Sequence, residues 1–424
     1  MENLNLSAFI HINRIKREDL DEQYFKKHKI TKSQISRAEN AKEKVSEEYE
    51  KKILDVMTID MSTAKQMLVI KHRDMLTFFN ELVCESNLTE SQGLKKLKQL
   101  ITHTGCHFYF VEDCLMEYMY LIHFQIVDEK YLSIKSLLKK LRVSLTKDHL
   151  AIYEYCLGLV EKKKSHIQQA ITHLENASQE AQSDLVKGMI FYYLGRVYRR
   201  HMELLRSQSC LQKSREYFQQ GHIYSRMINV DIAIAKNYIA DHSYRDAMKR
   251  LEDLLNSREI QYVSTKAIAS IYENMLRICV MTSNYEKAEQ IIRSVTGEVK
   301  LFLEKQNICF LYRLMLVHHQ NMISPQQTDG DRKKCCEDIS EICRGIVSDS
   351  LGDGIIDELL RYYKNFSGKK TEKIKFLKKA KKIIYLNQDY ESMWIWLMIA
   401  KKELNTSTEI EQLEKTMYQY LLNY

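Results

Sequence analysis

A single proline and 12 glycines are spread over the 424 residues of this chain. Tight turns and sheet connections depend on these two residues, so a chain this poor in them has little material for β-structure. Hydrophobic residues make up 45% of the chain and charged residues 28%, as in ordinary globular proteins. The sequence therefore predicts an all-α fold. Its length exceeds that of one compact core and predicts several units or an extended array.

Residues 30–42 carry the most informative local pattern, that of the second half of a helix-turn-helix unit. Ile30 is placed to fill the turn, and Thr31 has the chemistry of a residue that caps the next helix. That helix would bury Ile35 and Ala38 on one face. Its other faces are polar, so the pattern predicts a short helix that presents side chains to a DNA groove.

The side chains expected to read DNA fall into two groups. The candidates for base edges are Lys32, Ser33 and Arg37. The candidates for backbone contact or orientation are Gln34, Lys42, Lys26, Lys27 and Arg14. Residues 26–42 carry six Lys/Arg against one Glu. Charge alone is more typical of a solvated helical face, so the DNA interpretation depends on pattern and charge together.

From about residue 81 onward, the spacing of small and large apolar residues predicts helical hairpins of the tetratricopeptide type. Four windows fit, and they begin at Leu157, Leu194, Ile234 and Met275. In the second window, Gly195 matches Ser214 only if about seven extra residues lengthen the turn between the helices. Weaker repeats are expected over residues 81–145 and 300–424.

Stacked hairpins form a right-handed superhelix with the first helix of each hairpin on the concave side. An extended peptide bound there needs side-chain partners for its backbone groups. Asn both donates and accepts, and Arg can hold a carboxylate. The expected peptide contacts are Tyr192, Arg196, Arg199, Lys236, Asn237, Asn274 and Arg277. For each residue taken singly, a solvated helix face is the more ordinary interpretation.

Catalytic patterns are missing from the sequence. It has no Gly-rich phosphate loop, no nucleophile elbow and no His-Glu-x-x-His metal motif, which predicts no enzyme, no cofactor and no metal site. No apolar run approaches 18 residues, which predicts no membrane span. No secretion signal precedes the ten cysteines, so we expect a cytoplasmic protein with reduced thiols.

The apolar spacing over residues 6–57 resembles the small helical DNA-binding domain of the lambda-repressor/Xre type. The match runs from Leu6 to Thr31 without a gap. It departs from the usual pattern at Asp21, where Gln is common, at Phe25, where Ala is common, and at Lys29, where the turn usually has Gly. We expect this domain over residues 1–57, a linking helix over 58–80 and the repeats over 81–424.

Such a head followed by such repeats resembles the RRNPP family of peptide pheromone receptors, most closely its NprR- and PlcR-like regulators. The resemblance implies a cytoplasmic quorum-sensing transcription regulator that binds double-stranded operator DNA, is controlled by a short signalling peptide, and forms a homodimer. The departures at Asp21, Phe25 and Lys29 leave an alternative open. In it the head is degenerate, and the repeats sequester a response regulator or transcription factor under peptide control.

Overall fold

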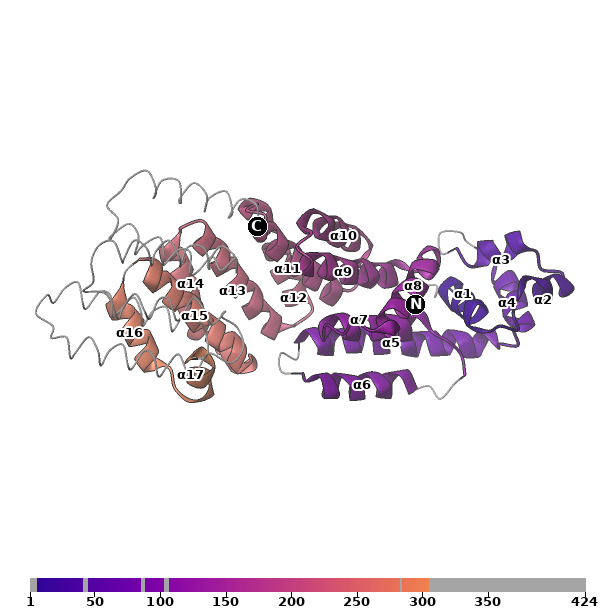
Figure 1. The fold of residues 1–424 in the computed structure, drawn as a ribbon, viewed down its shortest axis with the longest axis horizontal. Coiled ribbons are helices and arrows are strands. Elements are labelled where there is room, and N and C mark those ends of the chain that lie inside the picture. The colour runs from indigo at the N-terminus through magenta and orange to yellow at the C-terminus, as the bar shows by residue number, and fades with distance from the viewer. Residues whose placement is uncertain (1–5, 41–44, 85–87, 103–106, 283, 305–424) are drawn as a thin grey trace, which may run out of the picture. The chain divides into compact units, whose positions relative to one another are not determined.

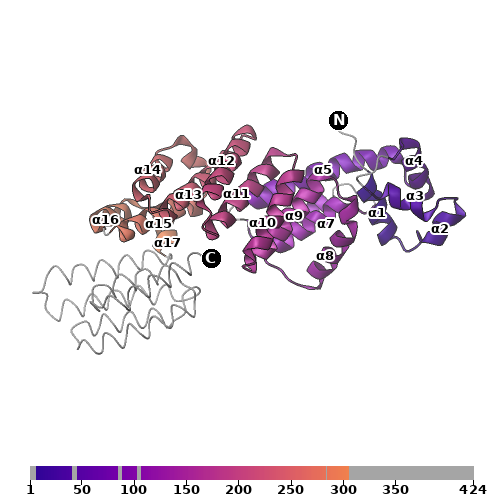
Figure 2. The ribbon, with the colours of Figure 1, turned by 90° about the horizontal axis from the view of Figure 1, so that it is seen from above.

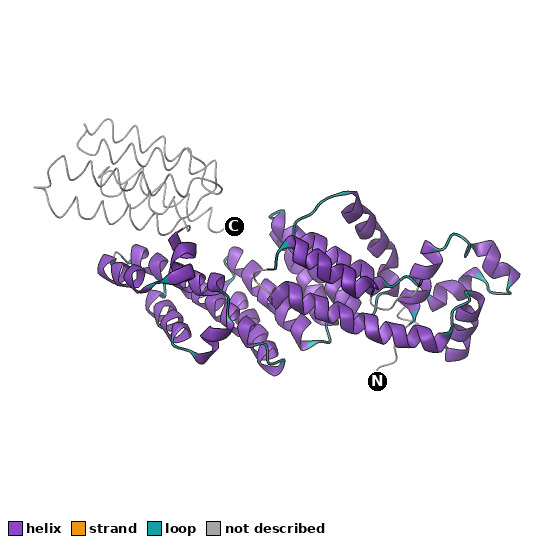
Figure 3. Cartoon of the chain, turned by 90° about the horizontal axis from the view of Figure 1, so that it is seen from below, coloured by secondary structure: helices purple, strands orange, loops and turns teal. Residues whose placement is uncertain are grey.

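The computed structural model describes residues 6–40, 45–84, 88–102, 107–282 and 284–304. Lys42 and the repeats expected beyond residue 304 lie outside these ranges. The predicted all-α fold is confirmed, because the described residues form 17 α-helices and two short 3-10 helices without a strand (Figures 1 and 3). The chain divides into two compact units, Met1–Val230 and Asp231–Tyr424. No helix in the described ranges has the length and apolar character needed to cross a bilayer.

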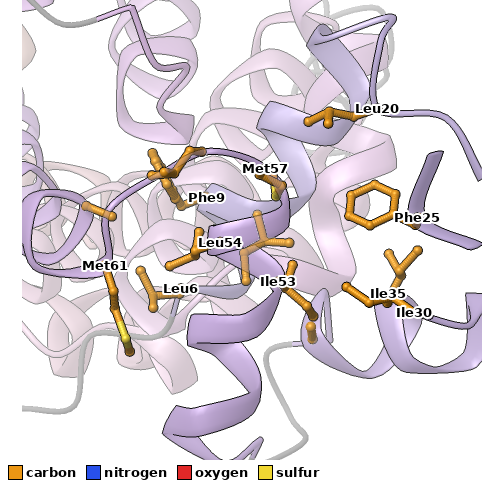
Figure 4. Close-up of a cluster of buried hydrophobic side chains, with 14 of the residues drawn as sticks. Leu6, Phe9, Leu20, Phe25, Ile30, Ile35, Ile53, Leu54, Met57 and Met61 are labelled. Atoms are coloured by element: carbon orange, nitrogen blue, oxygen red, sulfur yellow. The ribbon is translucent and has the colours of Figure 1, made fainter. Parts of the chain in front are cut away.

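Four short helices open unit 1 and form a head: α1 (Ser7–Lys16), α2 (Glu22–Lys27), α3 (Lys32–Ala38) and α4 (Glu47–Val56). Their apolar faces meet in one core, in which Phe9, Phe25, Ile53 and Leu54 are fully buried (Figure 4). The sequence placed Phe25 where related domains have Ala, and here its ring is fully buried in this core. In Figures 1 and 2, α2, α3 and α4 form the end of unit 1 that lies away from its later helices.

The turn between α2 and α3 forms as the sequence predicted. Ile30 is 2% exposed and fills the turn. The Thr31 side chain accepts a hydrogen bond from the Gln34 backbone N–H, and the Gln34 side chain accepts one from the Thr31 N–H, completing a capping box. Lys29 adopts a φ of 60°, the left-handed conformation that explains why Gly is usual at this position.

The next helix, α5 (Met61–Cys84), belongs to two parts of unit 1. Met61, Ala64 and Leu68 near its start are members of the head core. Further along, the side chain of Lys71 is completely buried. Its Nζ donates to the Ile101 carbonyl at 2.7 Å and lies 2.8 Å from the Asp113 carboxylate. Because a buried ammonium requires such partners, this contact holds three helices together.

The remaining helices of unit 1 are α6 (Glu90–Thr102), α7 (Val111–His123), α8 (Glu129–Leu141), η1 (Arg142–Ser144), α9 (Lys147–Lys163), α10 (Ile167–Glu180), α11 (Asp184–Arg200) and α12 (Leu204–Gln220), while α13 (Tyr224–Ala240) crosses into unit 2. The head is fastened to them by paired hydrogen bonds. The Asn13 amide donates to the Tyr109 carbonyl at 2.9 Å and accepts from the Tyr109 N–H at 3.1 Å. His11 Nδ1 lies 2.5 Å from Ser144 Oγ, and the Phe9 ring packs on Phe110.

The hairpin windows fold as paired helices, with one correction. Gly158 of α9 faces α10 so closely that an added Cβ would lie 2.7 Å from Leu174 Cγ, as the first window requires. The second window does not have a lengthened turn, because residues 201–203 alone separate α11 from α12. Gly195 faces Ser207, whose hydroxyl donates to its carbonyl at 2.6 Å. Ser214 instead donates to Gly188 at 2.7 Å, so the extra residues lengthen the helices.

In unit 2 the described helices after α13 are α14 (Tyr244–Leu255), η2 (Arg258–Tyr262), α15 (Thr265–Met281), α16 (Tyr285–Ser294) and α17 (Gly297–Glu304). The small residues that the repeat pattern placed at the starts of α14 and α16, Ala247 and Ala288, are both fully buried. Their burial agrees with the packing that the repeat pattern predicts for these positions.

Candidate functional site

Four cationic side chains gather within unit 1. Lys162 lies in the last turn of α9, Arg196 and Arg200 lie near the end of α11, and Arg226 lies near the start of α13. Positions 196 and 200 are one helical turn apart and share a face of α11. α9 and α11 pack against each other, which brings the lysine to the arginines. We call these residues, with Tyr155, Tyr192 and Tyr193, the tyrosine–cation cluster.

Aromatic rings hold the cations of the cluster in place. The Arg196 guanidinium carbon lies 5.4 Å from the ring centroid of Tyr192 and 5.5 Å from that of Tyr193. Lys162 Nζ lies 4.9 Å from the Tyr193 centroid, and the Tyr155 ring meets Tyr193 edge to face. Each cation–π contact contributes about 0.5–2 kcal/mol, which orients a cation without neutralising it.

The cluster carries positive charge without carboxylates. Among the described residues, none is an acidic partner of Lys162, Arg196 or Arg200. Burial, followed by the charge of Arg196 and its neighbours on α11, lowers the pKa of Lys162 to about 7. Burial, followed by Arg196, also lowers the pKa of Arg200. Arg226 Nε is buried and has no hydrogen-bond partner in the described part of the chain.

An anion is the chemical group that this arrangement accommodates. A carboxylate placed between the cations would accept charge-assisted hydrogen bonds and relieve their mutual repulsion. The tyrosine rings would pack against apolar or backbone groups beside that carboxylate. The cluster therefore has the properties of a binding site for a small acidic ligand or for the acidic part of a larger one.

Two of the expected peptide contacts, Tyr192 and Arg196, lie in the cluster. Arg199 is half-buried nearby on α11, and its charge helps lower the pKa of Lys162. The sequence did not predict the other members of the cluster, which are Tyr155, Lys162, Tyr193, Arg200 and Arg226. Tyr155, Lys162 and Arg226 come from neighbouring helices at positions outside the repeat spacing, and no local sequence signal marks them.

The other expected contacts lie in unit 2. Asn237 of α13 and Asn274 of α15 are buried, and Lys236 is half-buried. The Asn274 amide donates to the Ser270 carbonyl at 2.5 Å, within its own helix. Arg277 donates to Asn274 Oδ1 at 3.4 Å and to Glu273 at 3.1 Å. Asn274 and Arg277 are thus held by α15 itself, and the peptide contacts of all four residues stay a prediction.

The head presents a second candidate surface. Lys32, Ser33 and Arg37 are exposed on α3, and Lys26 and Lys27 are exposed in the last turn of α2. The Lys32 ammonium lies 3.2 Å from the Glu22 carboxylate, but both side chains are mostly in water, where such a pair contributes about 0–1 kcal/mol. The ion pair of Lys32 is therefore too weak to withhold its ammonium from a ligand.

The remaining DNA candidates of the head have structural roles. Gln34 serves the capping box. The Arg14 guanidinium forms a bidentate ion pair with the buried Glu39 carboxylate, which raises the pKa of Arg14. Asp21, where a phosphate-binding Gln is usual, is the N-cap of α2 and accepts from the Tyr24 N–H at 2.7 Å. The DNA contacts expected of Gln34 and Arg14 stay a prediction.

One group of side chains in the described residues could hold a metal ion. Ligand atoms of His72, Glu112 and His149 all lie within 4.8 Å of one another. The three residues come from α5, α7 and α9. Of these helices, only α9 also contributes to the tyrosine–cation cluster.

No known family model matches this chain, and no curated sequence matches it. Solved structures do match. A Rap protein in complex with competence and sporulation factor matches at 12% identity and a TM-score of 0.57, over 82% of this chain and 99% of that one. The apo form of RapI matches at 13% identity and a TM-score of 0.60, over 83% and 96%.

The apo form of the quorum sensor NprR from B. thuringiensis matches at 15% identity and a TM-score of 0.58, over 82% of this chain and 98% of that one. Aspartyl phosphate phosphatase F from Bacillus subtilis matches at 12% identity and a TM-score of 0.52, over 83% and 93%. These neighbours are regulators of the RRNPP type, so the structural resemblance expected from the sequence is confirmed. At such low identity the shared property is the fold.

Proposed function

We propose that this chain is a peptide-controlled transcription regulator. In this proposal the tyrosine–cation cluster binds an acidic group of a short signalling peptide, and α3 of the head reads operator DNA. The chain has no catalytic role of its own. The cytoplasm is its place of action, because both an imported peptide and chromosomal DNA are found there.

The observation that carries the proposal is the uncompensated charge of the cluster. Arg196 and Lys162 are held against the Tyr193 ring without a carboxylate among the described residues. Keeping cations partly desolvated and unpaired opposes folding, and a ligand that supplies the missing anion removes this penalty. A peptide offers such an anion at its C-terminus or in an Asp or Glu side chain. The structural neighbours include a Rap protein complexed with competence and sporulation factor and a quorum sensor, which supports a signal-binding role.

For the head, the exposed positions of Lys32, Ser33 and Arg37 on one capped helix support DNA recognition. Phosphate contacts would supply most of the affinity, and base edges would supply discrimination. A homodimer would place two heads on two half-sites. The peptide would then act by favouring one separation of the heads over another, by as much as its affinity for the two arrangements differs.

A second candidate function is supported by the head's own contacts and by one neighbour. Arg14 is committed to Glu39, and Asp21 places an acid where a phosphate-binding side chain is usual. Aspartyl phosphate phosphatase F shares the fold. In this alternative the chain sequesters or acts on a protein partner under peptide control, and the head serves as a docking surface.

One experiment addresses the peptide site. The full chain is incubated with a pool of random pentapeptides in two forms, with a free or an amidated C-terminus, and retained peptides are identified by mass spectrometry. We expect retained peptides to be enriched in carboxylates, and the enrichment to disappear in Arg196→Met. Arg206→Met is the matched control, because Arg206 also lies over a tyrosine ring, Tyr198 at 5.7 Å, but pairs with Glu203 at 2.9 Å.

A selection from random DNA duplexes addresses the head. We expect the wild type to enrich a sequence whose binding weakens as salt rises. Failure to enrich any duplex, together with a protein that co-purifies at fixed stoichiometry, would favour the second candidate. If neutral peptides were retained, and equally well by wild type and Arg196→Met, this result would contradict the assigned peptide site.

A further inference from the structure

A second cluster of chemically active side chains lies in unit 1 and takes no part in the proposed function. His72 comes from the middle of α5, Glu112 from the first turn of α7, and His149 from the first turn of α9. α7 packs against both α5 and α9, and Figure 1 shows the three helices side by side. Packing of these helices brings together one ligand atom from each residue, all within 4.8 Å of one another.

Two atoms of this cluster are buried without hydrogen-bond partners in the described part of the chain, Glu112 Oε2 and His149 Nε2. Glu112 is 1% exposed and His149 is 6% exposed. His149 Nε2 lies 3.1 Å from Glu112 Oε1, a distance that requires either a proton or a metal ion between the nitrogen and the carboxylate. The other carboxylate oxygen, Glu112 Oε2, is buried without a hydrogen-bond partner in the described part of the chain, so a cation beside it would stabilise the site.

The surroundings fix the histidine as they do in metal sites. The other ring nitrogen of His149, Nδ1, lies 2.9 Å from the Thr146 hydroxyl, which holds the ring with Nε2 facing Glu112. Metal-bound histidines are commonly oriented by such a bond on the second nitrogen. The His72 ring meets the His149 ring edge to face at 5.6 Å. Asp148 Oδ2 lies 3.8 Å from His72 Nε2 and adds another oxygen beside the site.

We propose that His72, Glu112 and His149 bind a divalent transition metal ion of the zinc class. Two imidazole nitrogens and one carboxylate oxygen are ligands that suit Zn²⁺, Co²⁺ or Fe²⁺ and suit Mg²⁺ or Ca²⁺ poorly. His72 is partly exposed, with 32% of its side-chain surface in water, and supplies the path of entry. The metal supplies positive charge beside the buried Glu112 carboxylate and joins α5, α7 and α9.

The site lies where the head is fastened to the rest of unit 1. Glu112 follows Phe110, whose ring packs on Phe9 of the head, and η1, just before α9, contains Ser144, which contacts His11. A metal bound by these helices stabilises the surface on which the head rests. Metal binding thus raises the stability of unit 1 and leaves the tyrosine–cation cluster unchanged.

The experiment uses the purified full chain, stripped with a chelator and titrated with Co²⁺, whose visible absorption reports protein ligands. We expect saturation at one Co²⁺ per chain, displacement of the absorption by Zn²⁺, and a higher Tm with Zn²⁺ than without. His72→Ala is the main variant because its partly exposed side chain can be removed with the least risk to folding. It should weaken Co²⁺ binding by at least about tenfold and abolish the Zn²⁺-dependent rise in Tm.

The matched control is His173→Ala. His173 also lies beside a buried carboxylate, Glu154, at 2.6 Å, but no second histidine among the described residues forms a metal-ligand group with that pair. We expect it to bind Co²⁺ like the wild type. Glu112→Gln is a second test, scored by Co²⁺ absorption in whatever fraction of the protein folds. Absence of Co²⁺ absorption in the wild type, or wild-type binding by His72→Ala, would overturn the proposal and leave a polar cluster that holds protons alone.

Discussion

The head and the tyrosine–cation cluster both gather positive charge, but they hold it in opposite ways. Lys32 of the head is mostly in water, with 79% of its side chain exposed, and has an acidic neighbour in Glu22. Lys162 of the cluster is half-buried, lies against a tyrosine ring, and has no acidic partner among the described residues. Water screens the charge of Lys32 at little cost. The charge of Lys162 carries a desolvation free energy that an anionic ligand can offset.

This difference explains what each region can recognise. Exposed cations attract a polyanion such as DNA from a distance and release counterions on contact, so their contribution falls with salt. Half-buried cations over aromatic rings recognise a single anion of defined shape, and salt screens them less. The following variants test this contrast.

The largest effect is expected for Arg196→Met. It should weaken binding of a carboxylate-containing peptide from the selected pool by about 100-fold, or about 3 kcal/mol, because the carboxylate would be left partly buried and unpaired. The free energy of unfolding of the free protein should stay the same or rise, since the variant also removes a repelling charge. Isothermal calorimetry measures the affinity, and urea unfolding measures the stability. A loss of stability without a loss of affinity would mean that Arg196 serves the fold alone.

In the head, the double variant Lys32→Ala with Arg37→Ala should weaken binding to a selected duplex by about 30-fold, or about 2 kcal/mol. Fluorescence anisotropy measures the affinity, and circular dichroism checks that the helices remain. Lys139→Ala with Lys140→Ala on α8 removes the same charge outside the head and should change affinity little. An equal loss of DNA affinity in both double variants would mean that net charge alone causes the effect, and that α3 has no special role.

The pH dependence of peptide binding should reveal Lys162. Its pKa in the free protein is about 7, and a bound carboxylate should raise it. Below pH 7 the Lys162 ammonium is already charged in the free protein, so this group does not make the peptide affinity depend on pH. Above pH 7 binding requires uptake of a proton, and affinity should fall by up to about tenfold per pH unit. Lys162→Met should flatten the profile, and a wild-type profile that is flat between pH 7 and 9 would exclude this linkage.

The smallest effect concerns the turn of the head. Lys29→Gly should raise the free energy of unfolding by about 0.5–1 kcal/mol, because Gly adopts the left-handed φ of 60° without a Cβ clash. Lys52→Gly in the middle of α4 is the matched control and should lower stability by about 1 kcal/mol. Thermal unfolding compares the two. A destabilised Lys29→Gly protein would show that the turn does not hold this conformation in solution.

The features predicted well from the sequence are local ones. Ile30, Thr31 and Ile35 lie within six residues, so turn, cap and buried face follow from short-range chemistry alone. The error in the second hairpin arose because repeat spacing cannot distinguish a longer turn from longer helices. Gly195 and Ser207 could be paired only once both helices were placed.

The tyrosine–cation cluster was predicted in part for the same reason. Tyr192 and Arg196 share one helix and one face, so the spacing within α11 was sufficient to select them. Lys162 joins them from α9, and its unusual pKa depends on burial and on neighbours that no single segment specifies. The group of His72, Glu112 and His149 is likewise formed by the packing of three helices, and no sequence motif predicts it.

The most direct test of the central claim compares one selected peptide in two forms that differ only in the charge of its recognised carboxylate, titrated by calorimetry into the wild type and into Arg196→Met. We expect that neutralising the carboxylate weakens binding to the wild type by about 100-fold, or about 3 kcal/mol, and changes binding to Arg196→Met little. Equal loss in both proteins, or equal binding of the two forms by the wild type, would contradict it.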